Sequence, residues 1–225
     1  MAIQQLIKKS ALLSAAMTIN WVIFTAISMS QIKPSWSDLD YLKWVSNPDV
    51  FYTVNYVNAT VLTFAVVWLF TLLFMYFLDK NKKLALIGLM FIPFYGVMNI
   101  VCYSIQITIV PSIAYNTIRT SGDILFAMQL VQSKSESVIG FINGLAYSIL
   151  GIPSIIYGYM LFKDIKKISG IFLLINGALC IIGIVGYLAK NTILASGVMV
   201  GGIAFLISLV FIIFEFGKKQ VIKQN

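Results

Sequence analysis

Amide and phenol side chains are the groups in this 225-residue chain that are best suited to recognise a ligand, and they recur inside strongly apolar stretches. Tyr95, Asn99, Tyr103 and Gln106 follow one another at intervals of four, four and three residues, which places them along one stripe of a helix. Amides can bond a polar head group while tyrosine rings contact an apolar body. Such a mixture is typical of small-molecule sites.

Three other apolar stretches carry amides or tyrosines that we expect at a similar depth in a membrane, whereas Asn176 lies nearer the middle of its stretch. An amide that faces lipid is costly, so these side chains should face the interior of a helix bundle. The predicted ligand-binding residues are Asn20, Asn55, Asn58, Asn99, Tyr103, Gln106, Asn143 and Tyr147. The alternative is that these amides only bond one another across helices.

Catalytic chemistry has little support in the sequence. The chain has no histidine, which excludes the His ligands of di-iron, haem and HExxH zinc sites and the His of serine hydrolase triads. Cys102 and Cys180 are single cysteines in different apolar stretches, which indicates packing residues. No acid, base, nucleophile or metal constellation is visible, so we predict a protein that is not an enzyme and that uses no cofactor and no metal.

The composition predicts an integral membrane protein, because 60% of the residues are hydrophobic, 11% are charged and the mean hydropathy is +0.92. A helix needs about 20 mainly apolar residues to cross a bilayer. Six stretches are long enough, and the predicted spans are 10–29, 51–78, 84–109, 138–162, 168–188 and 192–216. The segments between them include two long outer loops, at 30–50 and 110–137. The predicted fold is therefore a single all-α, six-helix transmembrane domain covering residues 1–225.

The basic residues predict the orientation. Eleven of the sixteen form four clusters separated by even numbers of spans, namely Lys8 and Lys9; Lys80, Lys82 and Lys83; Lys163, Lys166 and Lys167; and Lys218, Lys219 and Lys223. Cytoplasmic loops are rich in Lys and Arg, so both termini should be cytoplasmic. As topology signals, these lysines give no reason to expect a nucleic-acid partner. Fifteen Lys to one Arg, with abundant Ile, indicates a prokaryote and hence its plasma membrane.

The two outer loops contain features beyond simple connections. The 30–50 loop holds Trp36, Tyr41 and Trp44, an aromatic pattern typical of a membrane interface. In the 110–137 loop, one helical face is formed by Ile124, Ala127, Met128 and Val131. These loops are either partial lids over a site or surface loops with aromatic anchors.

Small residues mark the expected helix contacts, because they let helix backbones approach closely in a membrane. Steps of four residues separate Ala11 from Ala15, Gly140 from Gly144, and Gly197 from Gly201, and further glycines lie at 177, 183 and 186. These steps hold the helices of one chain together or form a face between two copies.

The region from 158 to 188 resembles a known family. It contains Gly-Tyr-Met-Leu-Phe at 158–162, a basic loop at 163–167, Ser-Gly-Ile-Phe-Leu at 169–173 and Gly-Tyr-Leu at 186–188. This pattern is similar to the tail of the prokaryotic membrane proteins grouped as domain-of-unknown-function family 4386. The chain departs from it in having Lys and Ile where that tail usually has a proline. The resemblance implies a six-helix bundle of unestablished function and no site residues.

Together these features predict a non-enzymatic membrane protein whose outward-facing polar and aromatic pocket binds a small amphipathic molecule or lipid, in transport or sensing. The alternative is a membrane-anchored interaction or immunity protein that acts through its outer loops. The expected partners are the lipid bilayer, a small amphipathic ligand, and a second copy or another membrane protein.

Overall fold

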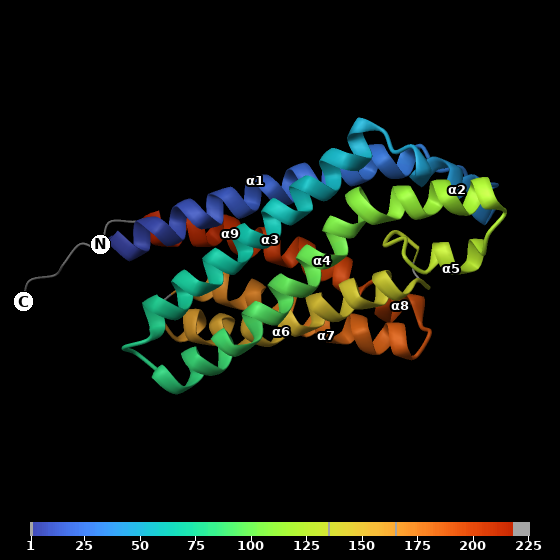
Figure 1. The fold of residues 1–225 in the computed structure, drawn as a ribbon. Helices are drawn as coiled ribbons and strands as arrows, with labels where there is room; N and C mark the ends of the chain where they lie inside the picture. Colours follow the sequence, from blue (N-terminus) through green and yellow to red (C-terminus); the bar gives the residue numbers. More distant parts are fainter. Residues whose placement is uncertain (1, 135, 165, 218–225) are drawn as a thin grey trace, which may run out of the picture. The chain divides into compact units, whose positions relative to one another are not determined.

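The computed structural model describes residues 2–134, 136–164 and 166–217, and within these ranges it is helical without strands (Figure 1). The helices are α1 (Ala2–Ser30), α2 (Asp38–Ser46), α3 (Val50–Phe77), α4 (Lys82–Thr120), α5 (Ile124–Met128), α6 (Val138–Lys163), α7 (Lys167–Leu188), α8 (Thr192–Ala195) and α9 (Gly197–Gly217). Six helical segments are long and apolar enough to cross a membrane, with α8 and α9 forming the sixth. The all-α, six-span prediction is confirmed.

The helix of the third predicted span extends into the predicted outer loop. The span is predicted to end at residue 109, and α4 continues through Pro111 to Thr120, so the 110–137 loop begins as helix. Proline normally disfavours a helix interior because it lacks an N–H. Here the added turns are stabilised by packing, since the buried Val110 and Ala114 share one hydrophobic cluster with Ala127 and Met128.

The chain divides into two compact units, and four helices contribute a segment to each. The first unit is formed by Met1–Ala15, Ala65–Phe94 and Tyr147–Asn225, and the second by Ala16–Phe64 and Tyr95–Ala146. The helices α1, α3, α4 and α6 are shared, whereas α7, α8 and α9 belong to the first unit and α2 and α5 to the second.

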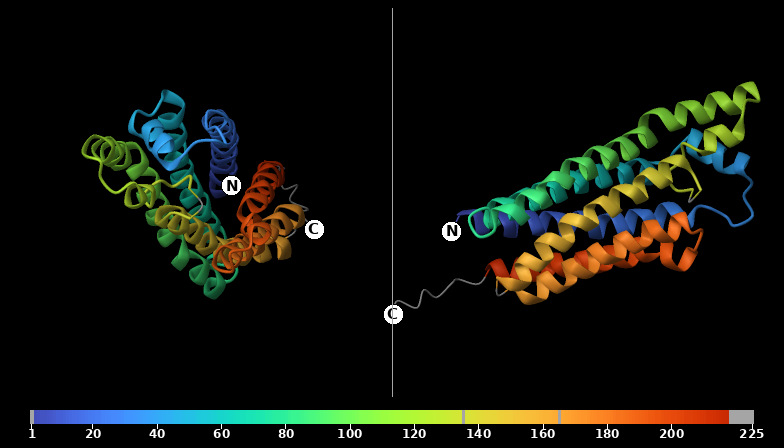
Figure 2. Two further views of the ribbon diagram at one scale, coloured as in Figure 1. Left: turned by 90° about the vertical axis from the view of Figure 1, so that its right-hand side faces the viewer. Right: turned by 90° about the horizontal axis from the view of Figure 1, so that it is seen from below.

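Glycine contacts hold the helices of the first unit closely together, and α7 packs against α9 (Figure 2). A Cβ atom built on Gly197 would lie 2.8 Å from the Leu179 carbonyl oxygen, and one on Gly201 would lie 3.3 Å from that of Asn176. The predicted Gly197 and Gly201 step therefore faces α7. These contacts leave no room for larger side chains without a shift of the backbone.

A second set of glycines joins α6 to α7. A Cβ atom on Gly151 would lie 2.7 Å from the Gly177 carbonyl oxygen, and one on Gly158 would lie 3.0 Å from that of Gly170. The two glycines of each helix are seven residues apart, so the two pairs match in one antiparallel register.

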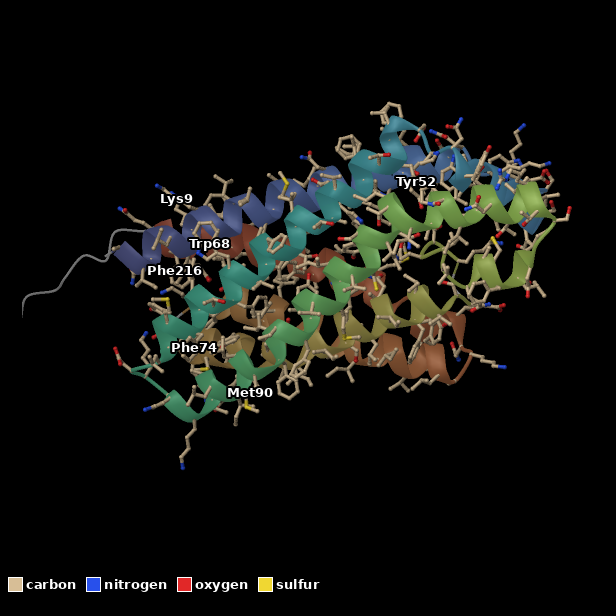
Figure 3. All side chains as sticks on the ribbon, viewed as in Figure 1. Lys9, Tyr52, Trp68, Phe74, Met90 and Phe216 are labelled. Atoms are coloured by element: carbon tan, nitrogen blue, oxygen red, sulfur yellow. The ribbon has the colours of Figure 1, made fainter. Side chains whose placement is uncertain are left out.

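Large apolar side chains project from the helices of the first unit. Trp68 is 51% exposed, Met90 is 65% exposed and Met199 is 73% exposed. Figure 3 labels Trp68 and Met90. Exposed apolar side chains in such numbers are unusual for a protein surrounded by water. They agree with a surface that contacts lipid.

The predicted basic clusters at Lys8, Lys80 and Lys163 all lie in the first unit. A Cβ atom on Gly217 would lie 3.3 Å from the Lys8 Nζ, so the end of α9 lies beside the beginning of α1. The fourth cluster, Lys218, Lys219 and Lys223, lies outside the described residues.

Within the second unit, α2 and α5 form a small helical layer. Ser37 caps α2 in a capping box with Asp40, and its hydrogen bonds lower the pKa of the Asp40 carboxyl. The buried face of α2 belongs to the same hydrophobic cluster as the predicted face of the 110–137 loop. On that face Ala127, Met128 and Val131 are buried, as the helical periodicity predicted.

Candidate ligand-binding site

The stripe on α4 supplies the first polar groups of the site. Asn99 and Gln106 are fully buried and Tyr103 is 3% exposed, so the residues predicted to share one helical face do turn into the protein interior. Buried amides need partners because a lost hydrogen bond is costly away from water. Two further elements of the second unit provide them.

Asn143 on α6 connects this stripe to a neighbouring helix. Its Nδ2 donates to the Asn99 Oδ1 at 2.8 Å and to the Tyr103 hydroxyl at 3.1 Å. Its Oδ1 accepts from the Gln132 Nε2 at 3.0 Å. One asparagine thus joins two side chains of α4 and a side chain from the segment that follows α5.

Gln106 holds the main chain of that same segment. Its Nε2 donates to the Leu130 carbonyl oxygen at 3.0 Å, and its Oε1 accepts from the Gln132 backbone N–H at 3.0 Å. A carboxamide used in this way pairs with a peptide as another peptide group would. The resulting amide cluster consists of Asn99, Gln106, Gln132 and Asn143.

Tyrosines surround the amide cluster. The Tyr56 hydroxyl donates to the Gln132 Oε1 at 3.0 Å, and the Tyr52 hydroxyl donates to the Gln106 Oε1 at 3.4 Å (Figure 3 labels Tyr52 at the start of α3). The ring centroids of Tyr52 and Tyr56 are 4.8 Å apart, and those of Tyr56 and Tyr103 are 6.2 Å apart. Amide groups therefore meet aromatic surfaces, which is the composition predicted for the site.

Residues 124–134, which we term the covering segment, are also attached to α2. The Tyr41 hydroxyl and the Ser133 Oγ are 2.5 Å apart, and the Lys134 Nζ lies 2.9 Å from the Asp38 Oδ1. Burial raises the pKa of the Tyr41 phenol, although the Ser133 hydrogen bond opposes the shift, so this hydroxyl stays protonated at neutral pH. The covering segment is thus anchored at its far end by exposed or half-buried polar contacts.

Four of the eight predicted site residues, Asn99, Tyr103, Gln106 and Asn143, come together in this network. Asn55 and Asn58 instead bond α1: Thr25 donates to the Asn55 Oδ1 at 3.2 Å, and the Asn58 Nδ2 donates to the Met17 carbonyl oxygen at 2.9 Å. Asn20 is half-buried on α1, and Tyr147 belongs to the first unit.

Sequence reasoning missed Gln132, Tyr52 and Tyr56. Gln132 lies in a loop, where polar residues are common and do not indicate a binding site. Its role depends on how that loop folds back onto the helices. The two tyrosines had a weak signal, because they lie within one turn of Asn55 and Asn58 in the same apolar stretch.

One polar atom of the amide cluster has no partner. The Nδ2 of Asn99 is buried and makes no hydrogen bond, while the Oδ1 of the same side chain accepts from Asn143. A buried, unpaired donor costs free energy that an acceptor placed beside it would recover. The amide cluster therefore lacks one hydrogen-bond acceptor, beside the Asn99 Nδ2.

The described residues hold no group of three or more Cys, Asp or Glu side chains able to bind a metal ion. Comparison with known proteins adds no relative: no protein-family model, curated protein or solved structure matches the chain.

Proposed function

We propose that the second unit binds a small amphipathic molecule or lipid at the amide cluster, on the outward-facing side of a prokaryotic plasma membrane, and that the protein serves transport or sensing without catalysis. The observation that carries this proposal is the unpaired Asn99 Nδ2. A carbonyl, carboxylate or hydroxyl oxygen on the ligand would accept its hydrogen. The rings of Tyr52, Tyr56 and Tyr103 would contact the apolar part of the ligand.

Entry to the cluster requires only the Gln132 side chain to move aside, because its Nε2 lies 3.0 Å from the Asn143 Oδ1. The side-chain bonds that hold Gln132 run to Asn143 and Tyr56. Such bonds in membrane proteins contribute only about 0.6 kcal/mol each on average. The carboxamide of Gln132 is thus an internal stand-in for a ligand head group, which could replace it at small cost.

A direct test is native mass spectrometry of protein released from membranes in mild detergent. The wild type should retain a small bound molecule, because the ligand recovers the unpaired donor. The Asn99→Leu variant should lose this mass, whereas Asn20→Leu, a matched change outside the cluster, should keep it. Circular dichroism would establish that both variants are folded. A wild type without any bound small molecule, or an Asn99→Leu variant that binds it equally, would contradict the proposal.

The orientation is a separate prediction. The first unit carries the lysines of three basic clusters, so the positive-inside rule places its charged end in the cytoplasm, with both termini. A reporter active only in the cytoplasm should work when fused after Asn225. The same reporter inserted at Ser121, in the exposed turn after α4, should be inactive. The opposite pattern would reverse the orientation and the outward-facing site with it.

One observation favours partner binding as a second candidate function. On α5, Leu125 is 70% exposed and Phe126 is 62% exposed, side by side on the surface of the second unit. Exposed apolar side chains that lie together can mark a site of protein interaction. In the mass-spectrometry experiment this function predicts a second polypeptide in place of a small molecule, and Phe126→Ser should remove it.

A further inference from the structure

A pocket of about 300 Å³ lies in the first unit, far in sequence from the amide cluster. It forms where α3 turns toward α4 and where α6 ends. Its lining consists of Phe77, Lys80, Asn81, Tyr159, Met160, Lys163 and Asp164. Lysines therefore stand on both sides, one from the α3 turn and one from the last turn of α6.

The single carboxylate of the pocket is already engaged by its neighbours. The Lys80 Nζ lies 2.5 Å from the Asp164 Oδ1, and the Tyr76 hydroxyl donates to the Asp164 Oδ2 at 2.6 Å. Lys166 lies 3.9 Å from that same Oδ2. Asp164 thus shares one negative charge between two lysines, and the region keeps a positive balance.

Lys80 remains a cation in this setting. Partial burial alone would lower the pKa of its ammonium group, but the hydrogen bonds to Asp164 and Tyr76 outweigh that effect and raise the pKa above its ordinary value. Lys163 is exposed, and no acid among the described residues forms an ion pair with it. Its charge is therefore open to an external anion.

The other lining groups add donors and an apolar floor. The Asn81 Oδ1 accepts from the Leu84 N–H at 3.2 Å, so the Nδ2 of Asn81 is the group left for a ligand. Phe77 and Met160 are buried beneath, and Tyr159 is 46% exposed at the edge. An anion attached to an apolar chain matches such a lining better than a free anion does.

The location in the fold agrees with this chemistry. Phe77 is the last residue of α3 and Lys163 the last of α6, and both helices are long and apolar enough to cross a membrane. The ends of such helices lie at the depth of the lipid head groups, where lysines attract anionic lipids.

We propose that this pocket binds the phosphate of an anionic phospholipid. Lys80 and Lys163 contact the phosphate oxygens, and the exposed ring of Tyr159 contacts the start of the acyl chains. This site is independent of the function proposed for the amide cluster.

The test compares lipids and single lysines on the full-length protein. Phosphatidylglycerol is added to protein in detergent, and bound lipid is counted by native mass spectrometry. Phosphatidylcholine is the comparison, because its choline cation balances its phosphate and leaves no net charge. Lys163→Gln should weaken phosphatidylglycerol binding about fivefold, since one lysine at a membrane surface contributes roughly that factor. Lys83→Gln, an exposed lysine on the neighbouring turn and outside the lining, is the matched control and should leave binding unchanged.

One more variant and one competitor complete the test. Lys163→Arg keeps the charge and should bind phosphatidylglycerol as the wild type does, which also shows that the position tolerates change. Inorganic phosphate should not displace the lipid, because it lacks the apolar chain. Equal losses in Lys163→Gln and Lys83→Gln, equal binding of both lipids, or displacement by inorganic phosphate would each overturn the proposal.

Discussion

Replacing Gly177 by alanine is expected to destabilise the protein by more than the roughly 1–3 kcal/mol that overpacking of a core usually costs. The new Cβ atom would lie 2.5 Å from the Gly151 carbonyl oxygen and 2.9 Å from the Ile155 backbone nitrogen. Backbone atoms cannot rotate away as the end of a side chain can, so α6 and α7 would have to separate. Thermal unfolding in detergent should show a much lower midpoint for this variant.

The matched control is Gly202→Ala, because nothing lies within 4 Å of a Cβ atom at that position. Alanine is favoured over glycine in a helix by about 0.5–1 kcal/mol, so this variant should unfold at the wild-type temperature or slightly above it. Equal midpoints for Gly177→Ala and Gly202→Ala would show that the α6–α7 contact does not require glycine.

The second large effect is expected at Asp164. Asp164→Asn removes the counter-ion that Lys80 and Lys166 share, and the Lys166 side chain is only 11% exposed. Loss of the Asp164 carboxylate leaves the mostly buried Lys166 ammonium without a counter-ion. The ammonium would keep its contact with the Phe216 ring, whose centroid lies 4.3 Å away. Breaking a fully buried pair costs about 3–5 kcal/mol, and partial exposure here should reduce the loss to about 2–3 kcal/mol.

Two further variants make this prediction specific. Asp79→Asn removes an exposed acid near the end of α3 and should leave the unfolding midpoint unchanged. Lys166→Met added to Asp164→Asn removes the stranded charge and should restore part of the lost stability. If the double variant were no more stable than Asp164→Asn alone, the buried lysine would not be the cause of the loss.

The sequence was sufficient for the transmembrane architecture, because each span is a long apolar run bounded by charged or polar residues. It was not sufficient for the end of α4. The apolar stretch is predicted to end at residue 109, and the packing of Val110 and Ala114 explains why the helix continues to Thr120.

The candidate site was predicted in part for a similar reason. The stripe of Asn99, Tyr103 and Gln106 follows from helical periodicity, which acts along one element. The position of Gln132 follows from how residues 124–134 fold back, and no local pattern specifies that. The contacts of Gly151 and Gly158 were missed as well. Two glycines seven residues apart indicate a helix contact only when the partner helix has two glycines at the same spacing.

The two glycine pairs of α6 and α7 also bear on the order of folding. They join helices that are adjacent in the chain, so their contacts close a short loop, and short loops form quickly. The pairs also match in only one register, so a hairpin that has slipped loses at least one close backbone contact. We therefore expect α6 and α7 to associate in their final alignment soon after both have entered the bilayer. The surface of α7 that contacts α9 would then be formed before α9 packs against it.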